Sequence, residues 1–359
     1  MLAAPLASLA AAQSPVQLQG IADAEFWSTS GESRLLSRND DRPSALGRIV
    51  IWGAAEPVSG LVFFAEAQGE GGPARIGAHE YHVDADQFGV RYARSPLVVV
   101  DVGRLVPVVG TFAARRFSTR NPLIGVPDGY PLVYPDGAEI SGEGRHFDYR
   151  AALVTLPVSH PGYQPRPTAR LRPAVGFGVT PFTGFRLGGS FTAGSYLNDD
   201  LTTSELNGQA WSSYHQRVVA FDAAFARGYL ETHAEAARGS YDVPGRTPAV
   251  GWTYYGEAKY TFGPRFFVAA RLERNEYPFI APAPTIQPVP TPTEWTVQLN
   301  DFVDGEAGVG YRLTASTLLK ASIRTDRWWP SGAQTLYGAS RPDGRAIAVQ
   351  WSQAFDVLR

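Results

Sequence analysis

Hydrophobic and polar residues alternate along most of the chain with a period of two. In one such segment, Phe185, Leu187 and Phe191 alternate with Arg186 and Ser190. Successive side chains of a β-strand point to opposite faces of its sheet, so this period indicates strands with one apolar and one polar face. Many of these segments run for about 10–14 residues, longer than the roughly 5–6 residues of strands in globular domains.

Short and long connections alternate along the chain between the predicted strands. Tight turns are expected at 181–184, 227–228, 263–264 and 315–316. Long polar or proline-rich connections are expected at 28–44, 105–136, 197–212 and 277–303, among others. This rhythm predicts about 16 strands, the first at 16–27 and the last at 344–357. A short strand at 137–143 is required so that the later turns stay on one side.

The composition favours the same architecture. The 359 residues include 37 Gly, 28 Pro, 16 Tyr, 19 Phe and 8 Trp, which suits many strands joined by turns. No apolar run approaches the roughly 18 residues that a membrane-spanning helix needs, and strands can cross hydrocarbon only as a closed sheet. We therefore predict an all-β protein: a closed antiparallel transmembrane β-barrel of about 16 strands, with short periplasmic turns and long external loops.

Charge and motif content remove several classes of function. The net charge of −2 gives no basic field for nucleic acid, and the absence of cysteine rules out disulfides and thiolate metal sites. The six histidines lack metal-ligand spacing, and the sequence has neither a nucleophile elbow nor a phosphate-binding loop. We predict no catalytic residue, no metal and no cofactor.

The first twelve residues are rich in alanine and leucine. With small residues at Ala10 and Ala12 before Gln13, residues 1–12 are typical of the end of a secretory signal peptide that lacks its basic start. A disordered alanine-rich N-terminus is the alternative. The remaining residues, 13–359, are predicted to form a single barrel domain.

Three segments resemble the Gram-negative outer-membrane porins, including the phosphate-selective porin O/P type. Val98 to Arg104 is similar to the fifth strand of such barrels, and Gly137 to Gly144 with Phe147 to Leu153 is similar to the next hairpin. The resemblance implies a location in the bacterial outer membrane, contact with its lipid, and assembly as a homotrimer. It also implies that the third long loop folds into the barrel and narrows the pore.

The loop 105–136 carries most of the candidate chemistry. Five prolines would stiffen it, and its apolar residues favour packing against another part of the chain. Inside a barrel its charged side chains would face water and form a pore constriction, made of Arg115, Arg116, Arg120, Asp128 and Asp136. An external flap is the alternative.

Six further charged residues on the predicted strands are expected to line the pore: Arg150, Arg170, Arg172, Arg186, Glu139 and Glu257. With the loop they suggest a mild preference for anions. The alternative is that lumen charges pair with one another and only hydrate the wall. The resulting hypothesis is a porin for passive diffusion of small polar solutes. An outer-membrane barrel enzyme, a structural barrel without channel activity, and a soluble β-sandwich or propeller are the competing hypotheses.

Aromatic residues near the predicted strand ends suggest lipid-facing girdles. These residues are Trp27, Trp52, Tyr92, Trp211, Tyr214, Trp252, Phe262, Phe266, Trp328, Trp329 and Trp351. The alternative is the general enrichment of aromatic residues in β-proteins.

Overall fold

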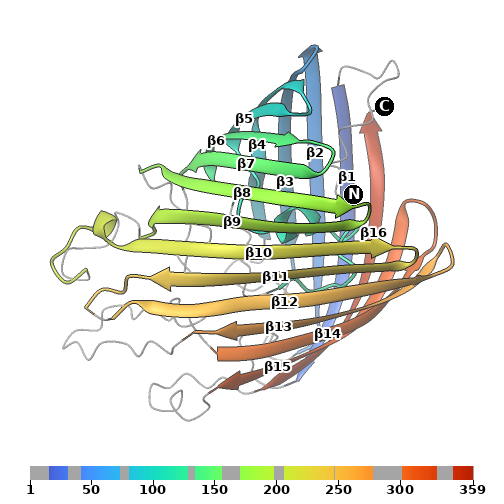
Figure 1. Ribbon diagram of the computed structural model, residues 1–359. Coiled ribbons are helices and arrows are strands. Elements are labelled where there is room, and N and C mark those ends of the chain that lie inside the picture. Colours follow the sequence, from blue (N-terminus) through green and yellow to red (C-terminus); the bar gives the residue numbers. More distant parts are fainter. Residues whose placement is uncertain are drawn as a thin grey trace.

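A computed structural model of the chain describes residues 16–30, 42–72, 81–127, 134–155, 170–197, 206–245, 247–277, 301–329 and 343–358. Most of these residues belong to strands of one closed sheet (Figure 1). The strands are β1 Val16–Ser30, β2 Ser44–Val58, β3 Leu61–Gly71, β4 Tyr81–Ser95, β5 Val98–Arg104, β6 Asp136–Glu143, β7 Phe147–Val154, β8 Arg172–Phe182, β9 Phe185–Ser195, β10 His215–Arg227, β11 Leu230–Tyr241, β12 Ala249–Phe262, β13 Phe266–Glu276, β14 Asp301–Arg312, β15 Thr317–Trp329 and β16 Gly344–Leu358.

Each strand pairs antiparallel with its neighbour in sequence, and β16 pairs with β1 to close the barrel. In Figure 1 the strands β8 to β13 cross the front of the molecule, and β2 and β3 run behind them. The predicted closed antiparallel barrel of about 16 strands is confirmed. The short strand required by the sides of the turns is present as β6.

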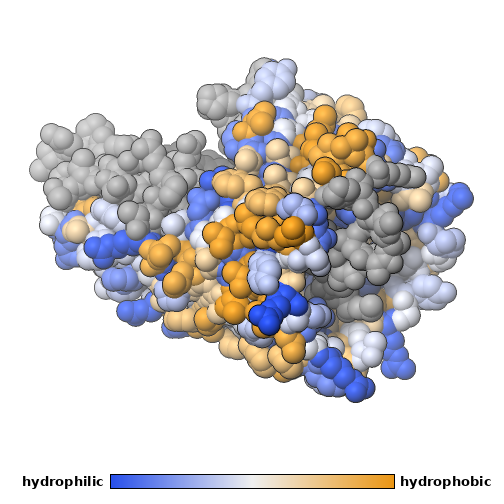
Figure 2. Space-filling model, turned by 90° about the horizontal axis from the view of Figure 1, so that it is seen from above, coloured by the Kyte–Doolittle hydropathy of each residue, from blue (hydrophilic) through white to orange (hydrophobic). Residues whose placement is uncertain are grey.

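Burial alternates along the strands as the sequence pattern predicts. In β12, Thr253, Tyr255 and Glu257 are buried, while Trp252 and Tyr254 are exposed. Hydrophobic side chains gather across the middle of the outer surface in Figure 2, and hydrophilic ones lie mostly towards its margins. An apolar outer face and a polar inner face suit a sheet with lipid on one side and water on the other.

Glycines with positive φ form the tightest turns. Gly184 (φ 88°) joins β8 to β9, and Gly263 (φ 65°) joins β12 to β13. Residues with a Cβ are strained in this region of backbone conformation, so glycine suits both positions. Because the strands alternate in direction, these short turns lie at the end of the barrel where β1 begins, and the long connections lie at the other end.

The described parts of the long connections contain two short 3-10 helices, η1 at Phe112–Arg115 and η2 at Trp211–Ser213. Among the described residues, no helix has the length and apolar character needed to cross a membrane.

The girdle prediction is wrong for three aromatic residues, Trp27, Tyr214 and Trp328, which are buried. On β1, Trp27 faces the same side as Glu25 and donates from its indole nitrogen to that carboxylate at 2.9 Å. On β15, Trp328 donates in the same way to Asp326 at 2.8 Å. Strand parity therefore decides the face of these side chains, and nearness to a strand end does not.

Candidate functional site

Residues 105–127, which follow β5, contact inward-facing side chains from strands around the barrel. The first contacts are apolar. Val108 packs in a buried cluster with Ala152 of β7 and Ala174 of β8. Val109 packs in another cluster with Val218 of β10. This first part of the loop therefore lies along the inner face of β7 to β10.

The helix η1 is anchored on β11 and β12. Thr111 donates from its backbone N–H and its hydroxyl to the Glu235 carboxylate, at 2.9 and 2.7 Å. Arg115 is 5% exposed and donates to Glu257 at 2.5 Å and to the Tyr255 hydroxyl at 3.1 Å. Burial acts to lower the pKa of Arg115, but Tyr255 and Glu257 raise it above its ordinary value. Arg115 therefore stays a cation and ties the helix to β12.

Arg116 points to other strands. Its guanidinium donates to Glu66 of β3 at 2.7 Å and to Asp86 of β4 at 2.5 Å, and it lies 4.8 Å from the centre of the Tyr134 ring. In the closed order of strands, β4 and β12 are as far apart as two strands can be. Two consecutive residues, Arg115 and Arg116, thus reach opposite walls, and the loop crosses the lumen between them.

Lys320 of β15 holds the middle of the loop. Its Nζ donates to the carbonyl oxygens of Ser118, Asn121 and Leu123 at 3.0, 3.1 and 2.9 Å. An ammonium group has three donors, so each of them is used by the loop.

Glu306 of β14 fixes the next turn of the loop. One of its carboxylate oxygens accepts from the backbone N–H groups of Ile124 and Gly125 at 3.1 and 3.0 Å. The Ile124 side chain packs in a buried cluster with Trp27 and Phe302. Trp27, the inward-facing tryptophan of β1, therefore packs against the loop.

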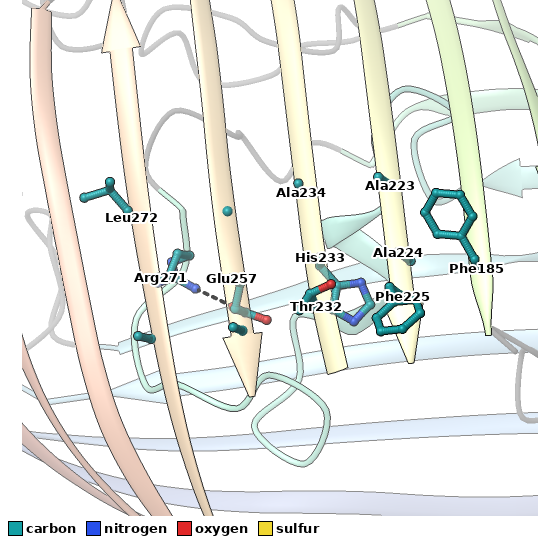
Figure 3. Close-up of a pocket in the computed structure, with 13 residues that line it drawn as sticks. Phe185, Ala223, Ala224, Phe225, Thr232, His233, Ala234, Glu257, Arg271 and Leu272 are labelled. Atoms are coloured by element: carbon teal, nitrogen blue, oxygen red, sulfur yellow. Dashed lines mark hydrogen bonds and ion pairs between the residues drawn. The ribbon is translucent and has the colours of Figure 1, made fainter. Parts of the chain in front are cut away.

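Charges of alternating sign connect these anchors across β12 to β14. Glu257 accepts from Arg115 and, at 3.4 Å, from Arg271, whose other end donates to Glu306 at 2.8 Å. Figure 3 shows the Arg271–Glu257 pair bridging β13 and β12. A buried charge is tolerated when it is paired and hydrogen-bonded, which this row of four groups achieves.

The pocket drawn in Figure 3, of about 480 Å³, includes Glu257 and Arg271 in its lining but opens away from the loop. Most of its lining side chains occupy outward positions of β9 to β13, among them Phe185, Ala223, Ala234, Ala258 and Leu272. It is a shallow depression in the outer face, where alanine and glycine lie between larger side chains.

Arg186 of β9 forms a second charged group on the inner wall. It is paired with Asp148 of β7 at 2.7 Å and with Asp222 of β10. Asp148, Gly178, Gly188 and Asp222 are aligned in register across β7 to β10. Because the two glycines carry no side chain, the guanidinium lies over them and reaches both carboxylates.

The five residues predicted for the constriction lie in different surroundings. Arg115 is buried and Arg116 is half-buried, and both form the ion pairs described above. Arg120 is exposed and donates to the Ala114 carbonyl oxygen at 3.1 Å. Asp136 pairs with Arg104 at 3.1 Å, and that guanidinium lies over the exposed ring of Phe88, on the outer side of β4 to β6. Asp128 lies outside the described residues.

The predicted lining residues also differ from one another. Arg150 of β7 donates to the Pro107 and Gly110 carbonyl oxygens of the loop at 3.4 and 3.3 Å. Arg172, at the start of β8, is buried and donates to Thr192 and Gln216 at 3.2 and 2.8 Å.

Three other predicted lining residues remain to be placed. Arg170 is exposed just before β8. Glu139 is half-buried on the inner face of β6, and it has no ion pair within the part of the chain that the structure describes. Glu257 lies under the loop.

The sequence reasoning did not single out Lys320, Glu306 or Glu66 as anchors of the loop. Their inward parity was readable from the alternation of each strand. Their partners in the loop are between 50 and 202 residues away in sequence, and no local pattern pairs them.

Comparison with known proteins gives a match in structure only. No protein-family model matches the chain, and no curated protein does. The chain is similar to OmpF of Salmonella typhi, solved in complex with daunomycin, with a TM-score of 0.60, 12% identity, and coverage of 95% of this chain and 97% of that one. For the anion-selective porin from Comamonas acidovorans the TM-score is 0.63, with 11% identity and coverage of 95% and 99%. For OmpT, an outer membrane protein of Vibrio cholerae, the values are 0.57, 10%, 95% and 97%.

Sequence identities this low support a shared fold and nothing finer. The structural match covers almost the whole of each chain. The chain has the closed 16-strand barrel fold of outer-membrane porins.

Proposed function

We propose that this protein is a porin of the bacterial outer membrane, through which small polar solutes diffuse passively. The observation that carries the proposal is the loop 105–127. It is tied by buried ion pairs and hydrogen bonds to opposite inner walls of a barrel whose outer face is apolar. A barrel of this strand number is wide enough for an aqueous channel, and a loop held inside it narrows that channel without filling it.

The polar inner wall supports a conduit more than a structural barrel. Half-buried charged groups remain on the inner face away from the loop anchors, among them Arg48, Arg91 and Asp148. Such groups stay hydrated only if water enters the lumen. The barrel enzyme remains a competing hypothesis, to which no described cluster of residues gives specific support. Assembly as a homotrimer and a signal peptide at 1–12 remain predictions from the sequence.

The ion pairs of Arg115 and Arg116 weigh against the predicted preference for anions. Their charges are matched by carboxylates at 2.5–2.7 Å, so they add little positive potential to the water beside them. Of the loop arginines, only Arg120 presents its charge to solvent.

The test is conductance in planar lipid bilayers. Protein refolded in detergent, whose folding is checked by heat-modifiable migration on a gel, should insert and give discrete current steps. Arg116→Ala should raise the step size, because it removes the ion pairs that hold the loop to β3 and β4. Arg104→Ala, on the outer face, is the matched control and should leave the step size unchanged. Folded protein that inserts without current steps would refute the proposed function.

A further inference from the structure

Carboxylates outnumber cations on the inner face of β1 to β4. We call this surface the acidic face, and its members are Asp23, Glu25, Glu66, Glu70, Asp84 and Asp86. Among the described residues, the arginine and lysine side chains that interact with them are Arg48 of β2, Arg116 of the loop and Lys320 of β15. These three cations are fewer than the six carboxylates, so the described part of this surface carries a net negative charge.

Each of the two arginines is shared. Arg48 lies 3.7 Å from Asp23, 3.2 Å from Glu25 and 3.2 Å from Glu70. Arg116 is shared between Glu66 and Asp86.

Asp84 has only the imidazole of His82 as an ionic partner among the described residues, and its side chain is 46% exposed. The excess negative charge of the acidic face therefore reaches the water of the lumen.

A second observation on the same surface is independent of this count. The Oδ1 atom of Asp23 and the Oε1 atom of Gln350 are buried and receive no hydrogen bond from any described group. Gln350 is aligned with Glu25 across the β1–β16 pair. The neighbouring Lys320 cannot supply a donor, because its three N–H groups are used by loop carbonyls. These two oxygen atoms can therefore each accept a hydrogen bond or contact a cation, and they lie beside the excess negative charge.

Further described cations on the inner wall offset this only in part. Arg91 is matched by Asp101, and Arg186 lies between two carboxylates. Arg150 donates to loop carbonyls, and Arg172 is buried among neutral groups. Of the described cations on the inner wall and the loop, these two arginines, Arg120 and Lys320 do not form an ion pair with a carboxylate, and they act against the acidic face.

We propose that the conduit prefers small cationic solutes to anionic ones, with the acidic face as the determinant. This inference rests on the proposed function and adds the substrate class to it. A wall of one net sign, with low-dielectric protein behind it, concentrates ions of the opposite sign in a narrow passage.

The test is the reversal potential in a potassium chloride gradient across a planar bilayer. Wild-type channels should be several-fold more permeable to potassium than to chloride. The variant Glu70→Gln/Asp84→Asn removes two carboxylates of the acidic face and leaves the Arg116 anchors intact, so the permeability ratio should fall towards one. The matched control, Asp136→Asn/Glu276→Gln, removes two carboxylates from outward positions and should keep the wild-type ratio.

The outcomes separate the two proposals. Channels that open but favour chloride, or whose selectivity is the same in both double variants, overturn the cation preference and leave the porin function standing. Folded protein without current steps refutes the porin function itself. A heat-modifiable band for each variant excludes misfolding as the cause of a change.

Discussion

Lys320 gives the sharpest test of how the loop is held. In Lys320→Met, a flexible side chain of similar length replaces the lysine, and the carbonyls of Ser118, Asn121 and Leu123 lose their donor. Each orphaned buried carbonyl costs about 1–3 kcal/mol, while removal of a buried ammonium returns several kcal/mol of desolvation. We expect a net loss of roughly 2–4 kcal/mol in the stability of the docked loop.

A loss of this size changes the docking equilibrium strongly. Since about 1.4 kcal/mol is a factor of ten, the detached fraction of the loop should rise by about 30-fold to 1,000-fold. Single-channel traces should show more frequent fluctuation between current levels, and trypsin should cut after Arg120 faster than in the wild type. The chain has one other lysine, Lys259, which pairs with Glu231 at 2.9 Å. Lys259→Met is the matched control.

The reasoning is refuted if folded Lys320→Met channels are as quiet as the wild type and are cut by trypsin at the same rate. A change of equal size in Lys259→Met would also count against it, because the effect would then follow from lost charge in the lumen.

Two further changes test the packing of the wall. Gly178→Val should lower the temperature of heat modification by a loss of about 1–3 kcal/mol, because the new side chain collides with Arg186, whereas Gly256→Ala, whose Cβ meets open space, should change little. Trp27→Ala should lower the stability by about 3–5 kcal/mol in the same assay and weaken docking of the loop. Trp351→Ala, at an outward position of β16, should lower the stability clearly less. Equal losses of stability in the two variants would contradict the inward packing of Trp27.

The strands could be predicted because their signal is local. A residue such as Phe191 shows its face through the parity of its immediate neighbours, and a turn such as Gly184 shows itself through its own chemistry. The same parity, read for Trp27, gives the inner face. The girdle interpretation gave the position of Trp27 near a strand end more weight than its parity.

The anchors of the loop could not be predicted in the same way. Arg115 meets Glu257, which is 142 residues away, and that pairing depends on how far the loop extends across a closed barrel. The sequence indicated that the loop arginines face water and set the sign of the potential. In the structure, Arg115 and Arg116 form ion pairs with carboxylates, because a charge shielded from water needs an opposite charge beside it.

The junction of β1 with β16 also determines when the barrel can be completed. Glu25 and Gln350 join across it at 2.7 Å, although 325 positions of chain separate them. The last hydrogen bonds of the sheet must therefore wait until β16 has been synthesised. Ile124 packs against residues of both ends of the chain, including Trp27 and Ala348. Docking of the loop and closure of the sheet are thus linked steps of assembly, and a variant that weakens the first should slow the second.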